Sequence, residues 1–237
     1  MAELIGHGIY SIPEAARLAG IAPTKVRRWV FGFTAKQQNG SRAHYAGLWD
    51  PEYRDEDEHA LSFRDLLEVR FVHAFRKHGV SLQAIRQAAS HARELLDTKY
   101  PFTCRQFRTD GRSVFAAVAP EVSDYEDRER LLDLAKRQYV FREVISPSLY
   151  AGIEYDQTGD AERWYPLPET RAIVLDPQRA FGKPILDDYR VPTEALAAAV
   201  KVEGDTTIVA RLYEIPEDQV RMAVKFEQGM AQRASAH

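Results

Sequence analysis

Residues 10–30, YSIPEAARLAGIAPTKVRRWV, contain the pattern of a complete helix-turn-helix. Ser11 and Glu14 have the S-x-x-E spacing of a capping box, so a helix is expected to begin at this point. Gly20 stands where the chain must turn sharply, and Pro23 can open a second helix. The stretch therefore predicts two short helices joined by a tight turn.

The second predicted helix has one apolar face and one basic face. Its apolar residues recur at helical spacing and are expected to face the core: Val26, Trp29 and Val30. Its outward residues include Lys25, Arg27 and Arg28, and no acidic residue occurs from 22 to 30. Helix-turn-helix units place such a helix in the major groove of DNA. The pattern favours double-stranded DNA as a partner, whereas an ordinary helical hairpin with the same apolar spacing is the alternative.

A short hairpin is predicted after the second helix. Asn39-Gly40 is a strong tight-turn signal between runs of polar and aromatic residues. We interpret this segment as a wing, a β-hairpin that would bring Lys36 and Arg42 near DNA phosphates. A surface loop is the alternative interpretation.

The composition is that of an ordinary globular protein, with 45% hydrophobic and 28% charged residues among 237. We see no signal pattern at the N-terminus and no apolar run near the ~20 residues that a membrane span needs. Cys104 is the only cysteine, which excludes a disulfide framework or a cysteine metal cluster. A cytoplasmic protein without a cofactor is therefore expected.

Charge is distributed unevenly, although the net charge is only −3. Residues 1–48 carry a net charge of +4 and residues 61–115 carry +5, with an acidic stretch at 49–60 between them. Residues 116–170 carry −6 and residues 171–237 carry −1. This asymmetry suits a DNA-binding half joined to a half that faces another partner.

The remaining pattern predicts a mainly α fold with small β-hairpins, an α+β class in three parts. Ser62 and Ser81 are expected to cap two helices with many apolar residues, Leu95 among them. A hairpin at Asp110-Gly111 and a long helix over 124–144 follow, the helix being our candidate for a homodimer contact. Strands are expected at 149–155 and 162–165, before a Pro-rich linker. We predict three domains, with residues 1–98 for DNA binding, 99–170 as a connecting and dimerisation region, and 171–237 as a C-terminal unit.

The C-terminal part repeats the apolar skeleton of the first unit (residues 10–30) at an offset of 194 residues. Helices are expected at about 193–201, 206–213 and 217–228. The offset maps residues 10–30 onto residues 204–224, which we call the second unit. Matched pairs include Ile21 with Ile215 and Val26 with Val220. Gly20 is replaced by Glu214, which predicts a different turn.

The outer face of the second unit does not repeat the basic charge of the first. Residues 216–224 carry Glu217, Asp218 and Arg221, a net charge of −1. Acidic residues at the start of a helix stabilise its dipole but repel phosphate. We infer a protein-contact module, whereas generic three-helix packing would explain the same skeleton.

Catalytic and metal-binding patterns are weak throughout the chain. We find no phosphate-binding loop, dinucleotide fingerprint or Ser/His/Asp signature. His91 and Glu94 lie one helical turn apart without an apparent third ligand, so no metal site is expected. Asp187-Asp188 could suggest a carboxylate-metal nuclease, but adjacent acidic residues in a turn more often cap it. We interpret the chain as a non-enzyme.

The N-terminal part resembles the MerR-type winged helix-turn-helix over about residues 9–97. The stretch quoted above matches its DNA-reading pair, and LSFRDLLEVRFVHAFRKHGVSLQAIRQA matches the two helices that follow. The resemblance implies contacts to DNA from the second helix and from the wing. The residues at matching positions are Thr24, Lys25, Arg27 and Arg28 on the helix, and Arg42 and Tyr45 on the wing.

The C-terminal part resembles a trihelical domain, formerly of unknown function, found in VapB-type antitoxins. The resemblance rests on a strand at 173–176, Gly182-Lys183-Pro184, Arg190-Val191-Pro192 and the helices of 193–228. It implies a type II antitoxin that neutralises a PIN-like ribonuclease toxin. We expect such a chain to repress its own operon as a homodimer on a palindromic site, because a single reading helix buries too little surface for specific affinity. The candidate toxin contacts are Arg190, Glu217, Asp218 and Arg221.

A MerR-like regulator that responds to a small molecule is the alternative function. Residues 98–170 would then hold a ligand pocket lined by aromatic side chains, which are more often plain core: Tyr139, Phe141, Tyr150, Trp164 and Tyr165.

Overall fold

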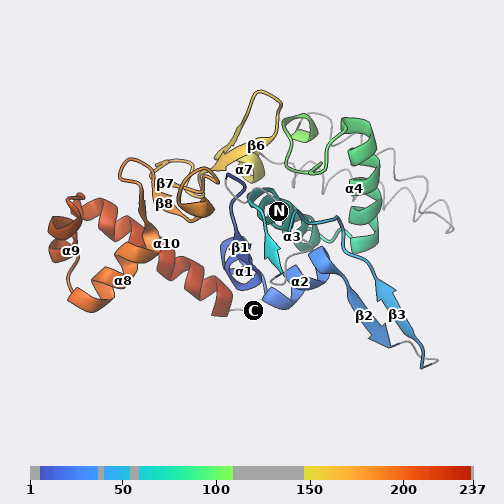
Figure 1. Ribbon diagram of the computed structural model, residues 1–237, viewed down its shortest axis with the longest axis horizontal. Helices are drawn as coiled ribbons and strands as arrows, with labels where there is room; N and C mark the ends of the chain where they lie inside the picture. Colours follow the sequence, from blue (N-terminus) through green and yellow to red (C-terminus); the bar gives the residue numbers. More distant parts are fainter. Residues whose placement is uncertain (1–5, 37–39, 54–58, 109–146, 236–237) are drawn as a thin grey trace.

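The computed structural model describes residues 6–36, 40–53, 59–108 and 147–235. The predicted class is confirmed, because helices dominate and the strands form small antiparallel pairs and one three-stranded sheet. Figure 1 shows the central helices α1 to α4 between a projecting hairpin at one end and the C-terminal helices at the other. None of the described helices combines the length and the apolar character that crossing a membrane requires.

The first unit forms the predicted pair of helices, and two longer helices follow it. These N-terminal elements are β1 (Tyr10–Ser11), α1 (Ile12–Ala19), α2 (Pro23–Phe31), β2 (Phe33–Lys36), β3 (Arg42–Tyr45), β4 (Ala60–Leu61), α3 (Phe63–Lys77) and α4 (Leu82–Leu96). Antiparallel pairing of β1 with β4 holds the start of α1 beside the start of α3. The chain therefore enters both helices from one small sheet.

Side-chain caps fix where these helices begin. The Ser11 side chain accepts a hydrogen bond from the Glu14 amide, and Glu14 accepts one from the Ser11 amide, so the predicted capping box is confirmed. Ser62 caps α3 in the same reciprocal way with Asp65, and Ser81 caps α4. Each cap satisfies backbone donors that the first turn of a helix leaves unpaired.

The N-terminal core is built around α3, which is buried along most of its length. The predicted core residues of this helix are all buried: Phe63, Leu66, Leu67, Val69, Phe71, Val72 and Phe75. On α4 the apolar residue Leu95 is not part of the core, because its side chain is 58% exposed. Leu95 lies beyond the buried stripe of α4, which ends at Ala92.

The middle of the chain contributes a short helix and a hairpin. These elements are α7 (Pro147–Tyr150), β5 (Ile153–Tyr155) and β6 (Ala161–Trp164). The strand predicted over 149–155 begins only at Ile153, because Pro147 opens a helical turn. The predicted turn at Asp110-Gly111 and the helix predicted over 124–144 lie outside the described residues.

The C-terminal part starts with a small sheet and ends in three helices. Its elements are β7 (Ile173–Val174), the 3-10 turn η2 (Ala180–Gly182), β8 (Ile185–Leu186), β9 (Val191–Pro192), α8 (Thr193–Glu203), α9 (Thr206–Tyr213) and α10 (Glu217–Ser235). The three strands pair antiparallel in the order β7-β8-β9. Helix α10 continues past the predicted end at 228, because Met230 is buried in the N-terminal core.

The turn of the second unit is the same as that of the first, and the prediction of a different turn was wrong. Gly20 has φ and ψ of 69° and 43°, and Glu214 has 55° and 38°. The amide of Ile21 donates to the carbonyl of Ala16 at 3.0 Å, and the amide of Ile215 donates to that of Ala210 at 3.0 Å. A left-handed conformation costs a non-glycine residue about 1–2 kcal/mol, so packing elsewhere in the unit must impose this turn.

The C-terminal part is packed against the N-terminal helices through several direct contacts. The Tyr10 hydroxyl donates to the carbonyl of Gly182 at 2.6 Å. Arg17 on α1 donates to the Glu227 carboxylate on α10 at 3.1 Å, and the Thr193 hydroxyl donates to the same carboxylate. The predicted boundary at residue 170 therefore separates segments that share one packed body, and the three domain ranges stay a prediction.

A buried carboxylate on α3 holds the segment that follows α4. Glu68 accepts hydrogen bonds from the amides of Phe102 and Thr103 and from the Thr103 hydroxyl, all at 3.0–3.1 Å. Burial raises the pKa of Glu68 to about 8, although these hydrogen bonds and the positive charge of Arg93 oppose the shift. The folded protein therefore keeps a proton on Glu68 that the unfolded chain releases at a much lower pH.

We expect the Glu68→Gln variant to lose the part of the pH dependence of stability that the Glu68 carboxylate causes. Because the folded pKa lies above the unfolded one, Glu68 favours folding at low pH, and this contribution is lost as pH rises toward about 8. The wild type should lose up to about 1.4 kcal/mol per pH unit between roughly pH 5 and pH 8 relative to the variant. Urea unfolding across this range measures the difference, and parallel curves for the two proteins would contradict the assignment.

Candidate nucleic-acid interface

The predicted contact residues of α2 share one exposed surface. Thr24, Lys25, Arg27 and Arg28 are all exposed, whereas the apolar residues of the helix face α1 and α3. Pro23 occupies the first turn of α2, where its missing amide leaves no donor unpaired. No acidic residue lies in that turn, so the positive end of the helix dipole and the basic side chains act together.

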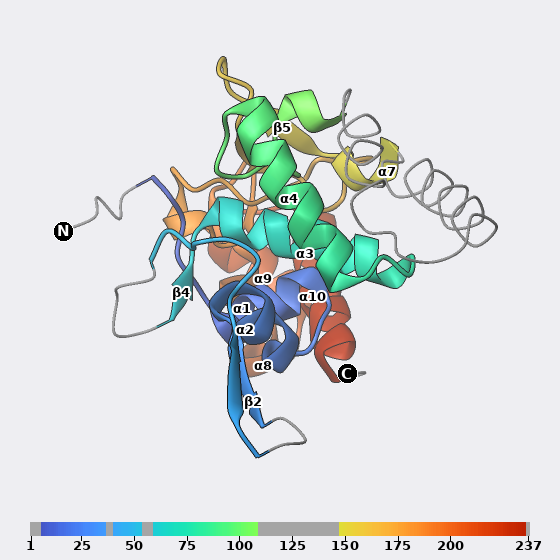
Figure 2. The same cartoon turned by 90° about the vertical axis from the view of Figure 1, so that its right-hand side faces the viewer.

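The predicted wing is present and projects from the body of the molecule (Figure 2). Strands β2 and β3 pair with Phe33 opposite Tyr45 and Lys36 opposite Arg42. A two-residue turn at Asn39-Gly40 would place Lys36 opposite Ala43, which the observed register excludes. Like charges directly opposite each other weaken a hairpin, and an anion between them would remove that penalty.

Two close backbone approaches fix the wing to the end of α2. A Cβ atom on Gly32 would lie 2.3 Å from the Tyr45 carbonyl oxygen, and one on Gly47 would lie 1.9 Å from the Val30 carbonyl oxygen. Only glycine fits at such distances. The two glycines therefore let the ends of the wing pass beside the last turn of α2.

Side chains of α4 and α3 secure the chain that leaves the wing. Arg86 donates to the carbonyl of Ala46 at 2.9 Å, and Arg93 donates to that of Leu48 at 2.7 Å. The Trp49 indole donates to the buried carboxylate of Asp65 at 2.7 Å. The wing is consequently anchored by the same helices that form the core.

An aromatic stack connects the second helix to the wing, and one of its members, Phe33, was not among the predicted site residues. The rings of Phe33 and Tyr45 stack at 4.8 Å between centroids, and the guanidinium of Arg28 lies 3.9 Å from the centre of the Phe33 ring. Such cation–π contacts orient a guanidinium without neutralising it. The sequence would identify Phe33 as a partner of Tyr45 only if the register of the hairpin were known.

The predicted partner contacts of the C-terminal part are not all free. Glu217 accepts a hydrogen bond from Thr206 at 2.8 Å and lies 3.2 Å from Arg221 as an ion pair. Asp218 and Arg190 are exposed, and Arg190 lies in the loop between β8 and β9 rather than on the helices. Three of the four residues therefore lie in the first turns of α10, and the fourth lies in the β8–β9 loop.

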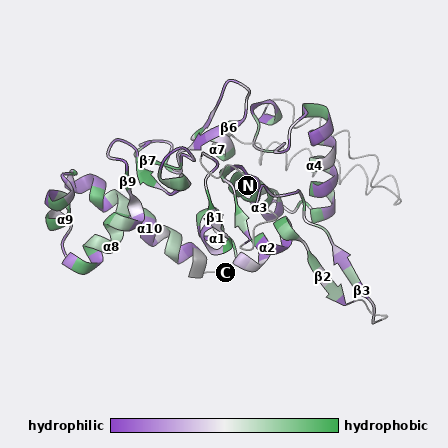
Figure 3. Ribbon diagram, viewed as in Figure 1, coloured by the Kyte–Doolittle hydropathy of each residue, from purple (hydrophilic) through white to green (hydrophobic). Residues whose placement is uncertain are grey.

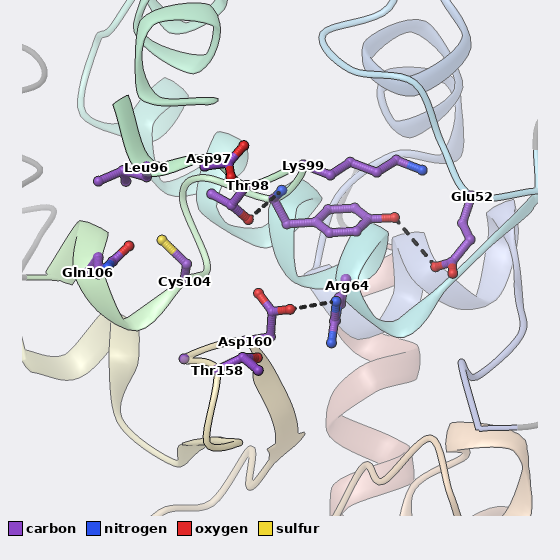
Figure 4. Close-up of a pocket in the computed structure, with 12 residues that line it drawn as sticks. Glu52, Arg64, Leu96, Asp97, Thr98, Lys99, Cys104, Gln106, Thr158 and Asp160 are labelled. Carbon is purple, nitrogen blue, oxygen red and sulfur yellow. Dashed lines mark hydrogen bonds and ion pairs between the residues drawn. The ribbon is translucent and has the colours of Figure 1, made fainter. Parts of the chain in front are cut away.

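A cavity of about 390 Å³ lies between the end of α4 and the β5–β6 hairpin (Figure 4). Arg64 and Asp160 in its lining form an ion pair at 2.9 Å. The Tyr100 hydroxyl donates a hydrogen bond to the Glu52 carboxylate at 3.4 Å. Burial raises the pKa of the Cys104 thiol in its wall to about 11, so this cysteine is protonated at neutral pH. The described residues that were predicted to line a ligand pocket are buried core instead: Tyr150, Trp164 and Tyr165.

The Asp187 carboxylate is engaged by neighbouring side chains. It accepts hydrogen bonds from Arg179 at 2.7 Å and from the Tyr165 hydroxyl at 2.8 Å. Partial burial alone would raise the pKa of Asp187, but these hydrogen bonds outweigh it and hold the pKa below its ordinary value. Among the described residues, no group of three or more side chains is arranged to hold a metal ion.

Comparison with known proteins agrees with this geometry. Residues 8–89 match the family described as "Putative DNA-binding HTH domain". The chain is 25% identical over 231 residues to "Putative antitoxin VapB45" of Mycobacterium tuberculosis (strain ATCC 25618 / H37Rv), an alignment that covers 91% of this chain and 92% of the relative. The resemblance to VapB-type antitoxins with an N-terminal helix-turn-helix is thereby confirmed.

A solved structure has the same fold. The crystal structure of Rv2018 from Mycobacterium tuberculosis matches with a TM-score of 0.65 at 23% identity. The match covers 91% of this chain and 96% of that one, so the similarity of fold extends beyond the helix-turn-helix.

We expect Gly47→Ala to destabilise the base of the wing. The added methyl group would collide with the Val30 carbonyl, which should lower the free energy of unfolding by about 2–4 kcal/mol. Gly40→Ala is the matched control, because nothing lies within 4 Å of a Cβ there and only its positive φ should cost about 1 kcal/mol. Denaturant unfolding measures both values. Equal losses for the two variants would contradict the close approach.

Proposed function

We propose that the chain is the antitoxin of a type II toxin-antitoxin system. It would neutralise a PIN-like ribonuclease toxin and repress its own operon by binding double-stranded DNA. The contrast between the two helix-turn-helix units carries this proposal. They share one turn geometry, yet residues 22–30 hold three basic residues and no acid, whereas residues 216–224 hold two acids and one base. The first unit thus suits phosphate, and the second suits a protein.

The DNA-facing residues of the proposal are those on α2 and the wing. They comprise Thr24, Lys25, Arg27, Arg28, Lys36, Arg42 and Tyr45, all exposed. Lys36 at the end of β2 lies opposite Arg42 at the start of β3, so two basic side chains near the tip of the wing are available to DNA phosphates. One helix in the major groove buries little surface, so we propose a homodimer on a palindromic site.

The chain acts by binding rather than by catalysis in this proposal. The Asp187 carboxylate already pairs with Arg179 and Tyr165, and Cys104 is a protonated thiol. Its proposed place of action is the cytoplasm, where operator DNA is accessible. The PIN-like toxin is expected from the gene beside that of this chain.

A MerR-like regulator that responds to a small molecule is the second candidate, and the cavity beside Cys104 favours it. Its charged side chains pair with one another, as Arg64 does with Asp160. The antitoxin proposal therefore ranks first. A small molecule that changes DNA affinity without any protein partner would favour the regulator.

We expect the double variant Arg27→Ala/Arg28→Ala to bind DNA weakly. Titration by fluorescence anisotropy against duplex DNA from upstream of the gene should show a lower affinity at 100 mM salt. The slope of log affinity against log salt should fall by about 2 if both side chains contact phosphate. Arg221→Ala is the matched control, because Arg221 occupies the position of Arg27 in the second unit. Unchanged affinity of the double variant would refute the role of α2.

We expect the purified chain to inhibit the adjacent ribonuclease at about one-to-one stoichiometry. Cleavage of a fluorogenic RNA should stop when the chain is added, and the Arg27→Ala/Arg28→Ala variant should inhibit equally well because it alters the DNA side only. Undiminished cleavage would overturn the antitoxin proposal. RNA cleavage by the chain alone, lost in Asp187→Asn/Asp188→Asn, would instead indicate an enzyme.

A further inference from the structure

The outward face of α9 presents hydrophobic side chains to solvent. Ile208 and Leu212 stand one helical turn apart and are 46% and 67% exposed, and Val202 at the end of α8 is 81% exposed. Four of the eight exposed large hydrophobic side chains among the described residues fall within 202–213. Single exposed hydrophobic residues are normal, whereas a cluster marks an interaction site. Figure 3 shows that α9 carries strongly hydrophobic residues beside hydrophilic ones.

Arg211 shares this surface with the two hydrophobic residues. It follows Ile208 by three positions and precedes Leu212, so the three side chains occupy neighbouring positions on the helix surface. Its side chain is exposed, and no carboxylate of the described part of the chain pairs with its guanidinium. We call these three residues the α9 face: Ile208, Arg211 and Leu212.

The first unit shows how the equivalent positions are covered. At the offset of 194, Arg211 corresponds to Arg17 and Leu212 to Leu18. Arg17 donates to the Glu227 carboxylate of α10 at 3.1 Å, and Leu18 is only 6% exposed in the N-terminal core. The two units have the same turn, and these positions are therefore equivalent. They are covered in the first unit and exposed to solvent in the second.

Helix α10 indicates the chemistry of a suitable cover. Its carboxylate, Glu227, is flanked by Phe226 and Met230, which both pack with the N-terminal core that contains Leu18. Around Glu227, α10 sets one acidic side chain between apolar ones, and amphipathic helices bind apolar faces through residues spaced by one turn.

We propose that the α9 face is the docking site for an amphipathic helix of the toxin, which sets a carboxylate against Arg211 and apolar side chains against Ile208 and Leu212. The proposal rests on the antitoxin function proposed above and names where on the chain the toxin binds and through which chemistry.

Charge favours the toxin over a second copy of this chain as the occupant. Residues 194–218, which comprise most of α8, all of α9, the start of α10 and the turns between them, hold six acidic and two basic residues. A second copy would bring the same negative charge and be repelled. A ribonuclease must carry basic surface to hold RNA, and this would complement the acidic surroundings.

The position of α9 permits DNA and toxin to bind together. Figure 1 shows α9 at one end of the long axis of the molecule and the wing at the other. A protein docked on the α9 face would therefore not occupy the surface proposed for DNA.

The test uses the intact chain with Leu212→Glu or Arg211→Glu, titrated by calorimetry against the purified adjacent ribonuclease. Each variant should bind the toxin about thirtyfold more weakly or worse, the loss typical of a central interface residue. Leu95→Glu is the matched control, because Leu95 is a similarly exposed leucine on α4, and it should bind as the wild type does. All three variants should keep the wild-type melting temperature and DNA affinity.

The outcomes separate this inference from the function on which it rests. If the wild type fails to bind the ribonuclease, the antitoxin function fails. If the wild type binds and both α9 variants bind equally well, the docking site is wrong while the function stands. Loss of self-association in Leu212→Glu, with toxin binding unchanged, would assign the face to a second copy and overturn the proposal. Restored binding between Arg211→Glu and a toxin carrying an acid-to-lysine change would identify the partner carboxylate.

Discussion

The packing of α10 across α1 is the constraint on which the rest of the structure depends. One buried carboxylate, Glu227, accepts hydrogen bonds from Arg17 on α1 and Thr193 on α8, so three helices meet at a single charged group. A buried charge is tolerated only when its partners are in place, because an unpaired one costs several kcal/mol. The C-terminal helices consequently cannot take another position relative to the first helix-turn-helix without leaving this carboxylate unsatisfied.

This packing determines how a partner at one end can affect the other. Helix α9 contacts α10, α10 contacts α1, and α1 contacts α2, so a continuous series of helices joins the proposed protein face to the proposed DNA face. A bound toxin changes DNA affinity only if it binds the free and DNA-bound forms unequally. Thermodynamic linkage then requires DNA to change toxin affinity by the same factor.

Features set by neighbouring residues could be predicted from the sequence. The capping boxes, the helices of the first unit and the three C-terminal helices depend on contacts within a few positions. Features set by distant contacts could not. The register of the wing, the exposure of Leu95 and the extension of α10 to Ser235 depend on which surfaces meet in space. The contact residues proposed for DNA follow from the local pattern, whereas the stack of Arg28 on Phe33 required the register.

The turn at Glu214 shows which part of a repeated unit is constrained. Its left-handed conformation would favour glycine, yet the hydrogen bond from Ile215 to Ala210 and the burial of Val220 keep the turn unchanged. Burial thus preserves the skeleton even against a local conformational cost, while the surface residues are free to differ. The outer charge and the exposed hydrophobic side chains therefore distinguish the surfaces of the two units, and each unit's partner must be inferred from them rather than from the shared fold.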